Sequence, residues 1–417
     1  MNQFLRLCIV DFFFRLSYYI SRTPLLPLFA LALGAREKDI GVICAASTIT
    51  GLMLKFHSGI LADIIGRRIF ILIGLTVGAV APFLYTFVKG LQSLLLIRYF
   101  HGIATATYTP ASQAATADVA EGRKGELFSY LSVVKIATKA VASFIGGAAI
   151  GYLVIPRERA LTDYEALQGY YLIYTACGGL GILAFMIALF YLRGVDKPTS
   201  TERGSAPKKK VNITEEFEKG ALEIITNKKL VITCSVDSAK GLAVGTLEAF
   251  LVIYAMKVAN LNVIFATMLW VCLTGMSVFC KPIMGRLSDK YGRQQIIYIG
   301  MMLCALPLVA IAMVKSFPVL LVLSAIFGIG EAFVTGSTVA FAADLCRRER
   351  YGAAMGVFGT ISEVGEAAGP MMAGFLIGWV GYSTTFGLFA IIMLAMTMLF
   401  EVKTKTTNGA TAPKEVE

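Results

Sequence analysis

The stretch that decides the fold is Gly-Ile-Leu-Ala-Asp-Ile-Ile-Gly-Arg-Arg at residues 59–68, because much of it returns later in the chain. Residues 285–293 read Gly-Arg-Leu-Ser-Asp-Lys-Tyr-Gly-Arg, which repeats both glycines, the leucine, the aspartate and the arginine 226 positions further on. The same offset relates Val10-Asp11 to Val236-Asp237, Lys55 to Lys281, Gly102-Ile103 to Gly328-Ile329, and Ala117-Asp118 to Ala343-Asp344. One constant offset in separate regions indicates a duplicated unit.

The composition places this repeat in a membrane. The chain has 417 residues, of which 57% are hydrophobic and 16% charged, whereas soluble domains have about a quarter of their residues charged. A spanning helix needs about 20 mostly apolar residues. This length predicts twelve spans, the first being a retained helix and not a signal peptide: 5–33, 38–58, 69–88, 91–115, 125–154, 167–192, 229–256, 261–284, 295–314, 317–341, 352–378 and 381–400.

The predicted fold is an all-α membrane protein with two pseudo-symmetric six-helix bundles around a central cavity. We expect an N-terminal bundle at 1–193, a linker with a short surface helix at 194–228, a C-terminal bundle at 229–402 and a tail at 403–417. If the N-terminus is cytoplasmic, cytoplasmic segments hold 23 of the 38 Lys and Arg residues and outer loops hold seven. The positive-inside rule therefore predicts cytoplasmic termini, in a plasma membrane or bacterial inner membrane.

The repeated loop resembles the signature loop of the major facilitator superfamily, which also repeats it in the second half. Residues 98–102, Arg-Tyr-Phe-His-Gly, resemble that family's Arg-x-x-x-Gly motif. The resemblance covers essentially the whole chain and implies a secondary transporter that works by alternating access.

A conformational switch is the role that we expect for the repeated loops. Asp63 can pair with a helix N-terminus, which favours an anion, and Arg67 can reach an acid such as Asp118. Such contacts form in one conformation and break in another. The predicted switch residues are Gly59, Asp63, Gly66, Arg67, Asp118, Gly285, Asp289, Gly292 and Arg293.

Charged residues inside the spans are the candidate site. Each costs at least about 2.5 kcal/mol at the bilayer centre, so each needs a water-filled path or a counter-charge. Lys55 and Lys281 lie at span ends. Away from their ends, the spans hold six bases and six acids, all on spans 1, 4, 5, 7, 10 and 11: Asp11, Arg15, Arg22, Arg98, Lys135, Lys139, Asp237, Lys240, Glu248, Glu331, Glu363 and Glu366. In the family that the chain resembles, spans 1, 4, 7 and 10 line the central cavity.

Spacing divides these charges into two candidate roles. Glu363 and Glu366 share a face of span 11, where two close carboxylates do not both ionise easily, as proton coupling requires. The residues predicted for proton coupling are Glu331, Glu363, Glu366, Asp237 and Asp11. Those predicted for substrate binding are Arg15, Tyr18, Arg22, Arg98, Lys135, Lys139 and Glu248.

Three functions remain open from the sequence. The first, which we favour, is proton-coupled export of small amphipathic or drug-like molecules, as in the drug/proton antiporters that the chain resembles. Residues 140–147 on span five lack the Gly-Pro pair of those antiporters, and residues 365–374 carry a similar motif on span 11 instead. This departure and the lysines of span five favour the second function, import or exchange of an anionic metabolite.

The third function is a membrane sensor on a transporter scaffold. No nucleophile–base, phosphate-loop or metal-ligand spacing indicates an enzyme, a cofactor or a metal site. The expected partners are a small-molecule substrate, protons and membrane lipids, with no nucleic acid, and the expected state is a monomer.

Overall fold

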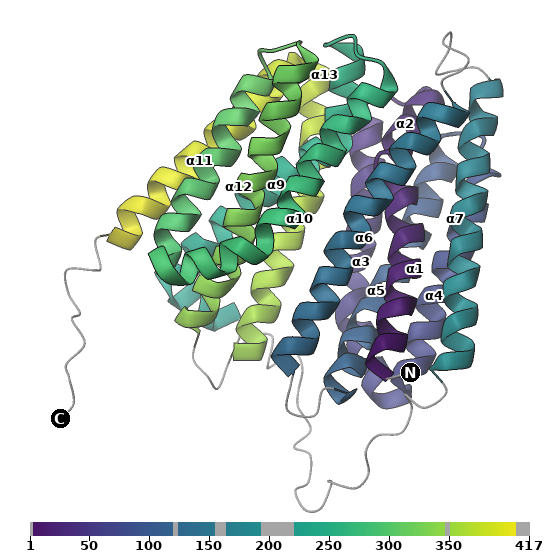
Figure 1. Ribbon diagram of the computed structural model, residues 1–417, viewed down its shortest axis with the longest axis horizontal. Helices are drawn as coiled ribbons and strands as arrows, with labels where there is room; N and C mark the ends of the chain where they lie inside the picture. Colours follow the sequence, from purple (N-terminus) through teal and green to yellow (C-terminus); the bar gives the residue numbers. More distant parts are fainter. Residues whose placement is uncertain (1–2, 120–123, 155–163, 193–220, 347–350, 406–417) are drawn as a thin grey trace, which may run out of the picture. The chain divides into compact units, whose positions relative to one another are not determined.

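A computed structural model describes residues 3–119, 124–154, 164–192, 221–346 and 351–405, and its secondary structure over these ranges is helical throughout, with no strand. The long helices are drawn in Figure 1, in which the colours follow the chain from purple to yellow. The prediction of an all-α protein is confirmed. Most of the expected tail and most of the expected linker lie outside these ranges. Residues 221–226 of the linker and 403–405 of the tail are described, and both are helical.

The described part of the first half holds seven helices. They are α1 (Gln3–Arg22), α2 (Leu25–Ala32), α3 (Glu37–Ile65), α4 (Arg67–Tyr85), α5 (Leu91–Val119), α6 (Lys124–Leu153) and α7 (Tyr164–Tyr191). The prediction of one helix over 5–33 is wrong in one respect, because Pro24 divides this segment into α1 and α2. Proline has no N–H to donate, and it disfavours helical geometry in the residue before it.

After the helical residues 221–226, the described part of the second half holds five long helices: α9 (Lys228–Lys257), α10 (Val263–Tyr291), α11 (Arg293–Ile311), α12 (Phe317–Leu345) and α13 (Tyr351–Lys405). Helix α13 holds two of the expected spans, because Gly381, with φ of 81°, breaks its helical geometry. Eight helices of the described residues are long and apolar enough to cross a membrane. When α1 with α2, α3 and α5 are added and α13 is divided, the twelve expected segments are accounted for.

The turns between paired helices explain why the repeated loop ends in glycine. Gly66 separates α3 from α4 with φ of 126°, and Gly292 separates α10 from α11 with φ of 90°. A residue with a Cβ atom rarely adopts such a positive φ, whereas glycine does so at little cost. The two copies of the loop therefore fold alike.

The duplication also extends to helix packing. A Cβ atom added to Gly74 of α4 would lie 2.8 Å from the backbone nitrogen of Tyr108, and one added to Gly300 of α11 would lie 3.0 Å from that of Val334. Both members of this contact are related by the offset of 226 residues. Small residues at such crossings let two membrane helices approach closely.

The described residues form two compact units. The first joins the described residues up to 192 with Leu247–Thr274 and Pro370–Trp379, and the second holds 221–246, Gly275–Gly369 and the described residues from Val380 onward. Parts of α9, α10 and α13 thus pack with the helices of the first half. The domain boundaries at 193, 228 and 402 stay a prediction from the repeat.

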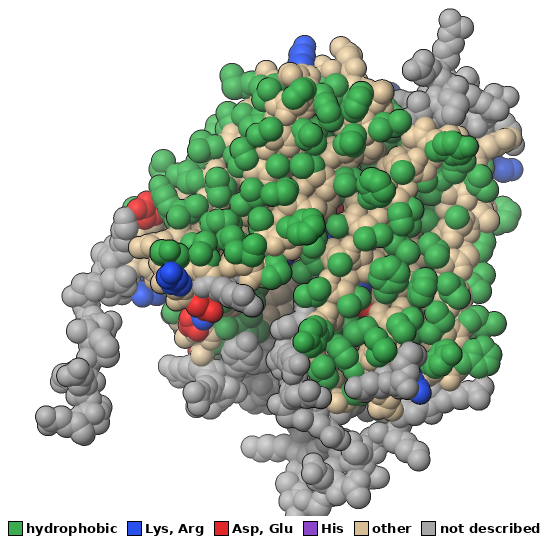
Figure 2. Space-filling model, viewed as in Figure 1, with side chains coloured by type: hydrophobic (Ala, Val, Ile, Leu, Met, Phe, Trp, Pro, Cys, Tyr) green, Lys and Arg blue, Asp and Glu red, His purple; other side chains and the backbone are tan. Residues whose placement is uncertain are grey.

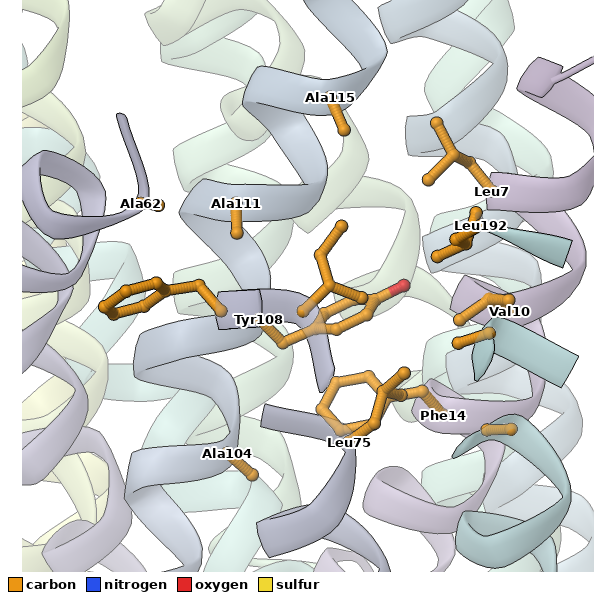
Figure 3. Close-up of a cluster of buried hydrophobic side chains, with 14 residues drawn as sticks. Leu7, Val10, Phe14, Ala62, Leu75, Ala104, Tyr108, Ala111, Ala115 and Leu192 are labelled. Atoms are coloured by element: carbon orange, nitrogen blue, oxygen red, sulfur yellow. The ribbon is translucent and has the colours of Figure 1, made fainter. Parts of the chain in front are cut away.

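In the first unit, α3 packs on α5, α4 on α5 and α7, and α1 on α6 and α7. Buried apolar side chains fill the space among α1, α4 and α5, as the close-up of Figure 3 shows. The rings of Phe14 and Tyr108 lie at the centre of this core, with their centroids 4.2 Å apart. The core fixes the position of α1, which carries several of the candidate site residues.

Large apolar side chains also cover the outside of the helices. The face seen in Figure 2 is mostly hydrophobic. Phe144 and Phe279, for example, are 62% and 76% exposed. Continuous exposed apolar surface is rare on soluble monomers, whereas lipid chains cover it at no cost in a membrane.

Candidate functional site

A buried carboxylate, Glu248 of α9, is the centre of the charge cluster in the first unit. Its Oε1 atom lies 2.6 Å from Nε of Arg22, at the end of α1, and accepts a hydrogen bond of 2.9 Å from the hydroxyl of Thr23. Its Oε2 atom lies 3.5 Å from Nζ of Lys139 on α6. The Glu248 side chain is only 6% exposed. A carboxylate so removed from water needs these partners, because an unpaired buried charge is costly.

An indole ring completes this cluster. Nζ of Lys139 lies 5.7 Å from the centroid of the Trp270 ring on α10, which is within the range of a cation–π interaction. Trp270 is 1% exposed, and its Nε1 atom donates no hydrogen bond to the described residues. We call Arg22, Thr23, Lys139, Glu248 and Trp270 the Glu248 cluster.

Sequence reasoning found only part of the Glu248 cluster. It named the three charged members as substrate-binding residues, but it did not pair them, and it missed Thr23 and Trp270. One signal was present, because Arg22 and Glu248 are related by the repeat offset of 226 positions. The duplication therefore placed opposite charges at equivalent positions of the two halves.

Lys135 lies one helical turn before Lys139 on α6, as the spacing predicts. Its side chain is exposed, and it makes no hydrogen bond or ion pair with the described residues. It lies about 17 Å along α6 from Lys124, at 1.5 Å per residue, which is within the span. An ammonium group at that depth is stable only where it meets water or an anion.

A second buried carboxylate, Asp237 of α9, is the centre of the charge cluster in the second unit. Its Oδ1 atom accepts hydrogen bonds from Nζ of Lys240 at 3.0 Å and from the hydroxyl of Thr338 at 2.8 Å. Its Oδ2 atom accepts one from the hydroxyl of Ser362 on α13. Asp237 and Lys240 thus form an ion pair three residues apart on α9.

Further acids surround Lys240. Its Nζ atom is also 3.3 Å from the hydroxyl of Thr335, and Glu331 and Glu366 are close enough to act on its charge. Glu331 is paired at 3.1 Å with Lys281 of α10, a lysine that spacing alone placed simply at a span end. We call Asp237, Lys240, Lys281, Glu331 and Glu366 the Asp237 cluster.

The last acid predicted for proton coupling on α13 is Glu363. Its side chain is half-buried, three residues before Glu366 of the Asp237 cluster. The structure therefore brings Asp237, Glu331 and Glu366 together around one lysine. Asp11 belongs to neither cluster, because it pairs with Arg15 of the same helix at 2.7 Å. That i,i+4 pair follows the sequence spacing.

Arg98 of α5 is fully buried among helices of the first unit. It donates to the hydroxyls of Ser47 and Tyr85 and to the carbonyl oxygen of Ile43. Nδ1 of His101 lies 3.1 Å from the Tyr85 hydroxyl, and the Tyr18 ring packs edge-on against His101 with centroids 5.0 Å apart. The structure thus places two predicted substrate-binding residues, Arg98 and Tyr18, in a polar network inside the helix packing.

Arg293, in the second copy of the repeated loop, makes the kind of contact that was expected of Arg67 in the first. Nη1 of Arg293 lies 2.8 Å from Asp344, and Nη2 lies 3.4 Å from Asp289. Asp344 is the repeat equivalent of Asp118, which was the expected partner of Arg67.

In the first half, Arg67 donates to the carbonyl oxygen of Ala114 at 2.7 Å. A Cβ atom added to Gly59 would lie 3.7 Å from Cβ of Pro110, which is an ordinary contact. The structure does not describe the side chains of Asp63 and Asp118 or the surroundings of Gly285.

Duplicated apolar helices with paired charges in their interior define a multi-pass membrane protein. The comparison of sequences then gives its family. Residues 7–281 and 272–416 match the Major Facilitator Superfamily, and the chain belongs to this superfamily of transporters, which carry small molecules across membranes and are not enzymes.

Two curated relatives extend over most of the chain. An uncharacterised transporter of the same type from Methanocaldococcus jannaschii is 25% identical over 376 residues, 89% of this chain and 91% of that protein. The quinolone resistance protein NorA of Staphylococcus aureus is 24% identical over 360 residues, 85% of this chain and 84% of NorA.

Two solved structures share the fold. A bacterial homologue of the human lysosomal transporter Spinster, inward-facing and unoccupied, has a TM-score of 0.83 at 14% identity, covering 99% of this chain and 98% of that one. The nucleoside transporter NupG has a TM-score of 0.77 at 14% identity, covering 97% of this chain and 100% of that one.

Proposed function

We propose that this protein is a proton-coupled secondary transporter that exports small amphipathic molecules by alternating access. The observation that carries the proposal is the Asp237 cluster, in which three acids share Lys240 within membrane-spanning helices. Buried acids whose charges are balanced by a movable counter-charge are what proton coupling needs.

The coupling follows from charge balance. Glu331 is paired with Lys281, and both Glu331 and Glu366 interact electrostatically with Lys240. A proton that binds one of these acids removes its attraction for a lysine, so the hydrogen bonds that join α9, α10, α12 and α13 weaken together. Because these helices must rearrange when access alternates, proton binding shifts the conformational equilibrium.

Support for export comes from the relative named for quinolone resistance. Removing a drug from the cell is one way in which a transporter gives resistance to it. The chain resembles that relative over most of its length, which favours an amphipathic or drug-like solute moving outward in exchange for protons.

The proposed setting is a plasma membrane or bacterial inner membrane, with a monomer whose two termini are cytoplasmic. The excess of Lys and Arg in the segments on that side supports this orientation. A protease added to intact cells should leave both termini uncut, and cleavage of the tail at 403–417 from outside would contradict the orientation.

Transport in proteoliposomes tests the coupling. Wild-type protein should accumulate an amphipathic dye against its gradient when a pH gradient is imposed, and Glu331→Gln and Glu366→Gln should each abolish this accumulation. Glu37→Gln is the matched control, since Glu37 is an acid of the first unit that pairs with Lys257 at 2.8 Å and is not a member of the Asp237 cluster. Normal accumulation by both cluster variants would contradict the proposal.

Import or exchange of an anionic metabolite is the second candidate. The Glu248 cluster favours it, because two cations face a single carboxylate and Lys135 lies one turn away. Counterflow of a radiolabelled organic anion that is faster than counterflow of the dye, and is insensitive to the pH gradient, would favour this function over proton-coupled export.

A further inference from the structure

We propose that Arg22, Lys139 and Trp270 bind the carboxylate of an amphipathic solute, and that Glu248 occupies their site when no solute is bound. The inference rests on the proposed function in one respect, that the chain moves an amphipathic solute. It adds the chemical class of that solute, an organic anion, and a role for Glu248 as an internal competitor.

The positive charges of the Glu248 cluster favour the binding of an anion. Arg22 and Lys139 both face Glu248, so two cations contact this single carboxylate. Lys135, one turn along α6, adds another positive charge with no ion-pair partner among the described residues. Lys135 and Lys139, four residues apart, thus present two cations on one face of α6 beside Glu248.

The hydrogen bonds of the cluster show that Glu248 fits this place incompletely. Oε1 of Glu248 has both Arg22 and Thr23 as partners, whereas Oε2 is buried, lies 3.5 Å from Nζ of Lys139 and accepts no hydrogen bond from the described residues. The buried Nε1 atom of Trp270 likewise donates no hydrogen bond to the described residues. A tethered side chain leaves these groups unsatisfied, and a free carboxylate can approach them more closely.

Trp270 supplies the other half of the specificity. Its ring lies beside Lys139 and is almost fully buried. The apolar part of a solute that packed against this ring would therefore be removed from water. An apolar contact and a cationic contact side by side select an amphipathic anion over a cation or a fully polar anion. The expected ligand is therefore a carboxylate with an apolar chain or ring.

The fluorescence of Trp270 reports binding directly. The chain has two tryptophans, and Trp379 is 83% exposed, so Trp379→Phe leaves one emitter at the site. We would titrate this full-length protein in nanodiscs with octanoate, octylammonium and octanamide, at concentrations below micelle formation. Octanoate should change the emission saturably, and the two matched compounds should not.

Variants in the same background test the competition. Glu248→Gln should lower the half-saturating octanoate concentration about tenfold, and Glu248→Asp, a shorter competitor, about threefold. Lys139→Gln should raise it about tenfold. Glu37→Gln, which removes an acid of the same unit outside the cluster, should leave it unchanged.

Two results would overturn the inference: equal responses to octanoate and octylammonium, or octanoate binding that weakens or stays the same in both Glu248 variants. No pH gradient is used, so these results are independent of proton coupling. If dye transport proves uncoupled from protons, the octanoate titration still tests the anion site. If octanoate does not bind, dye transport under a pH gradient still tests the proton coupling.

Discussion

Replacing Arg22 and Glu248 singly and together measures how strongly the first charge cluster holds its helices. The two side chains are 18% and 6% exposed, and their charged atoms are 2.6 Å apart. Glu37 and Lys257, a pair in the same unit, are 22% and 40% exposed and 2.8 Å apart. The two pairs thus differ in burial far more than in distance, which makes the second an internal control.

The expected magnitudes differ by burial. Removing one partner of a buried ion pair costs about 3–5 kcal/mol, because the other charge is left without compensation. Exposed pairs are worth about 0.2–1 kcal/mol. We therefore expect a coupling energy of at least about 2 kcal/mol between Arg22→Gln and Glu248→Gln, and less than about 1 kcal/mol between Glu37→Gln and Lys257→Gln.

The assay is a double-mutant cycle of reversible unfolding in mixed micelles, with sodium dodecyl sulfate as denaturant. Glu248→Ala adds a further check, since acetate can fill the space of the lost carboxylate and should raise the unfolding midpoint of this variant alone. Coupling energies that are equal for the two pairs, or below about 1 kcal/mol for Arg22 and Glu248, would refute the reasoning.

Three further predictions follow from the packing and the polar contacts. Gly74→Leu should destabilise the protein by about 1–3 kcal/mol in the same assay, because its side chain would overlap α5, whereas Gly179→Leu should be tolerated in its open surroundings. Asp344→Asn should change stability by less than about 1 kcal/mol but alter the initial transport rate, since its pair with Arg293 is largely exposed. Arg98→Lys should lower the unfolding midpoint, because an ammonium group cannot keep all three hydrogen-bond acceptors of the guanidinium, and an unchanged midpoint would contradict this.

The repeat made much of the fold predictable. A constant offset located both positive-φ turns, at Gly66 and Gly292, and apolar length located the spans. The division at Pro24 was missed because the apolar run continues through it, and hydropathy does not register a lost hydrogen-bond donor. Span counting depends on composition, whereas helix continuity depends on backbone chemistry.

The candidate site was predictable only at short range. Asp11 with Arg15, and Asp237 with Lys240, follow from three- and four-residue spacing on one helix. Glu331 with Lys281, 50 positions apart, does not, because one helix carries no information about which face of another it meets. Uncharged members such as Trp270 were missed because an aromatic residue in an apolar span normally indicates packing.

The most direct test of proton-coupled transport is the reciprocal one, in which a solute gradient drives protons. Proteoliposomes that contain pyranine and start with equal pH on both sides should show a change in internal pH when the transported solute is added outside. The account predicts that protons move opposite to the solute, and that Glu366→Gln abolishes this movement. Solute flux by the wild-type protein with no change in internal pH would contradict it.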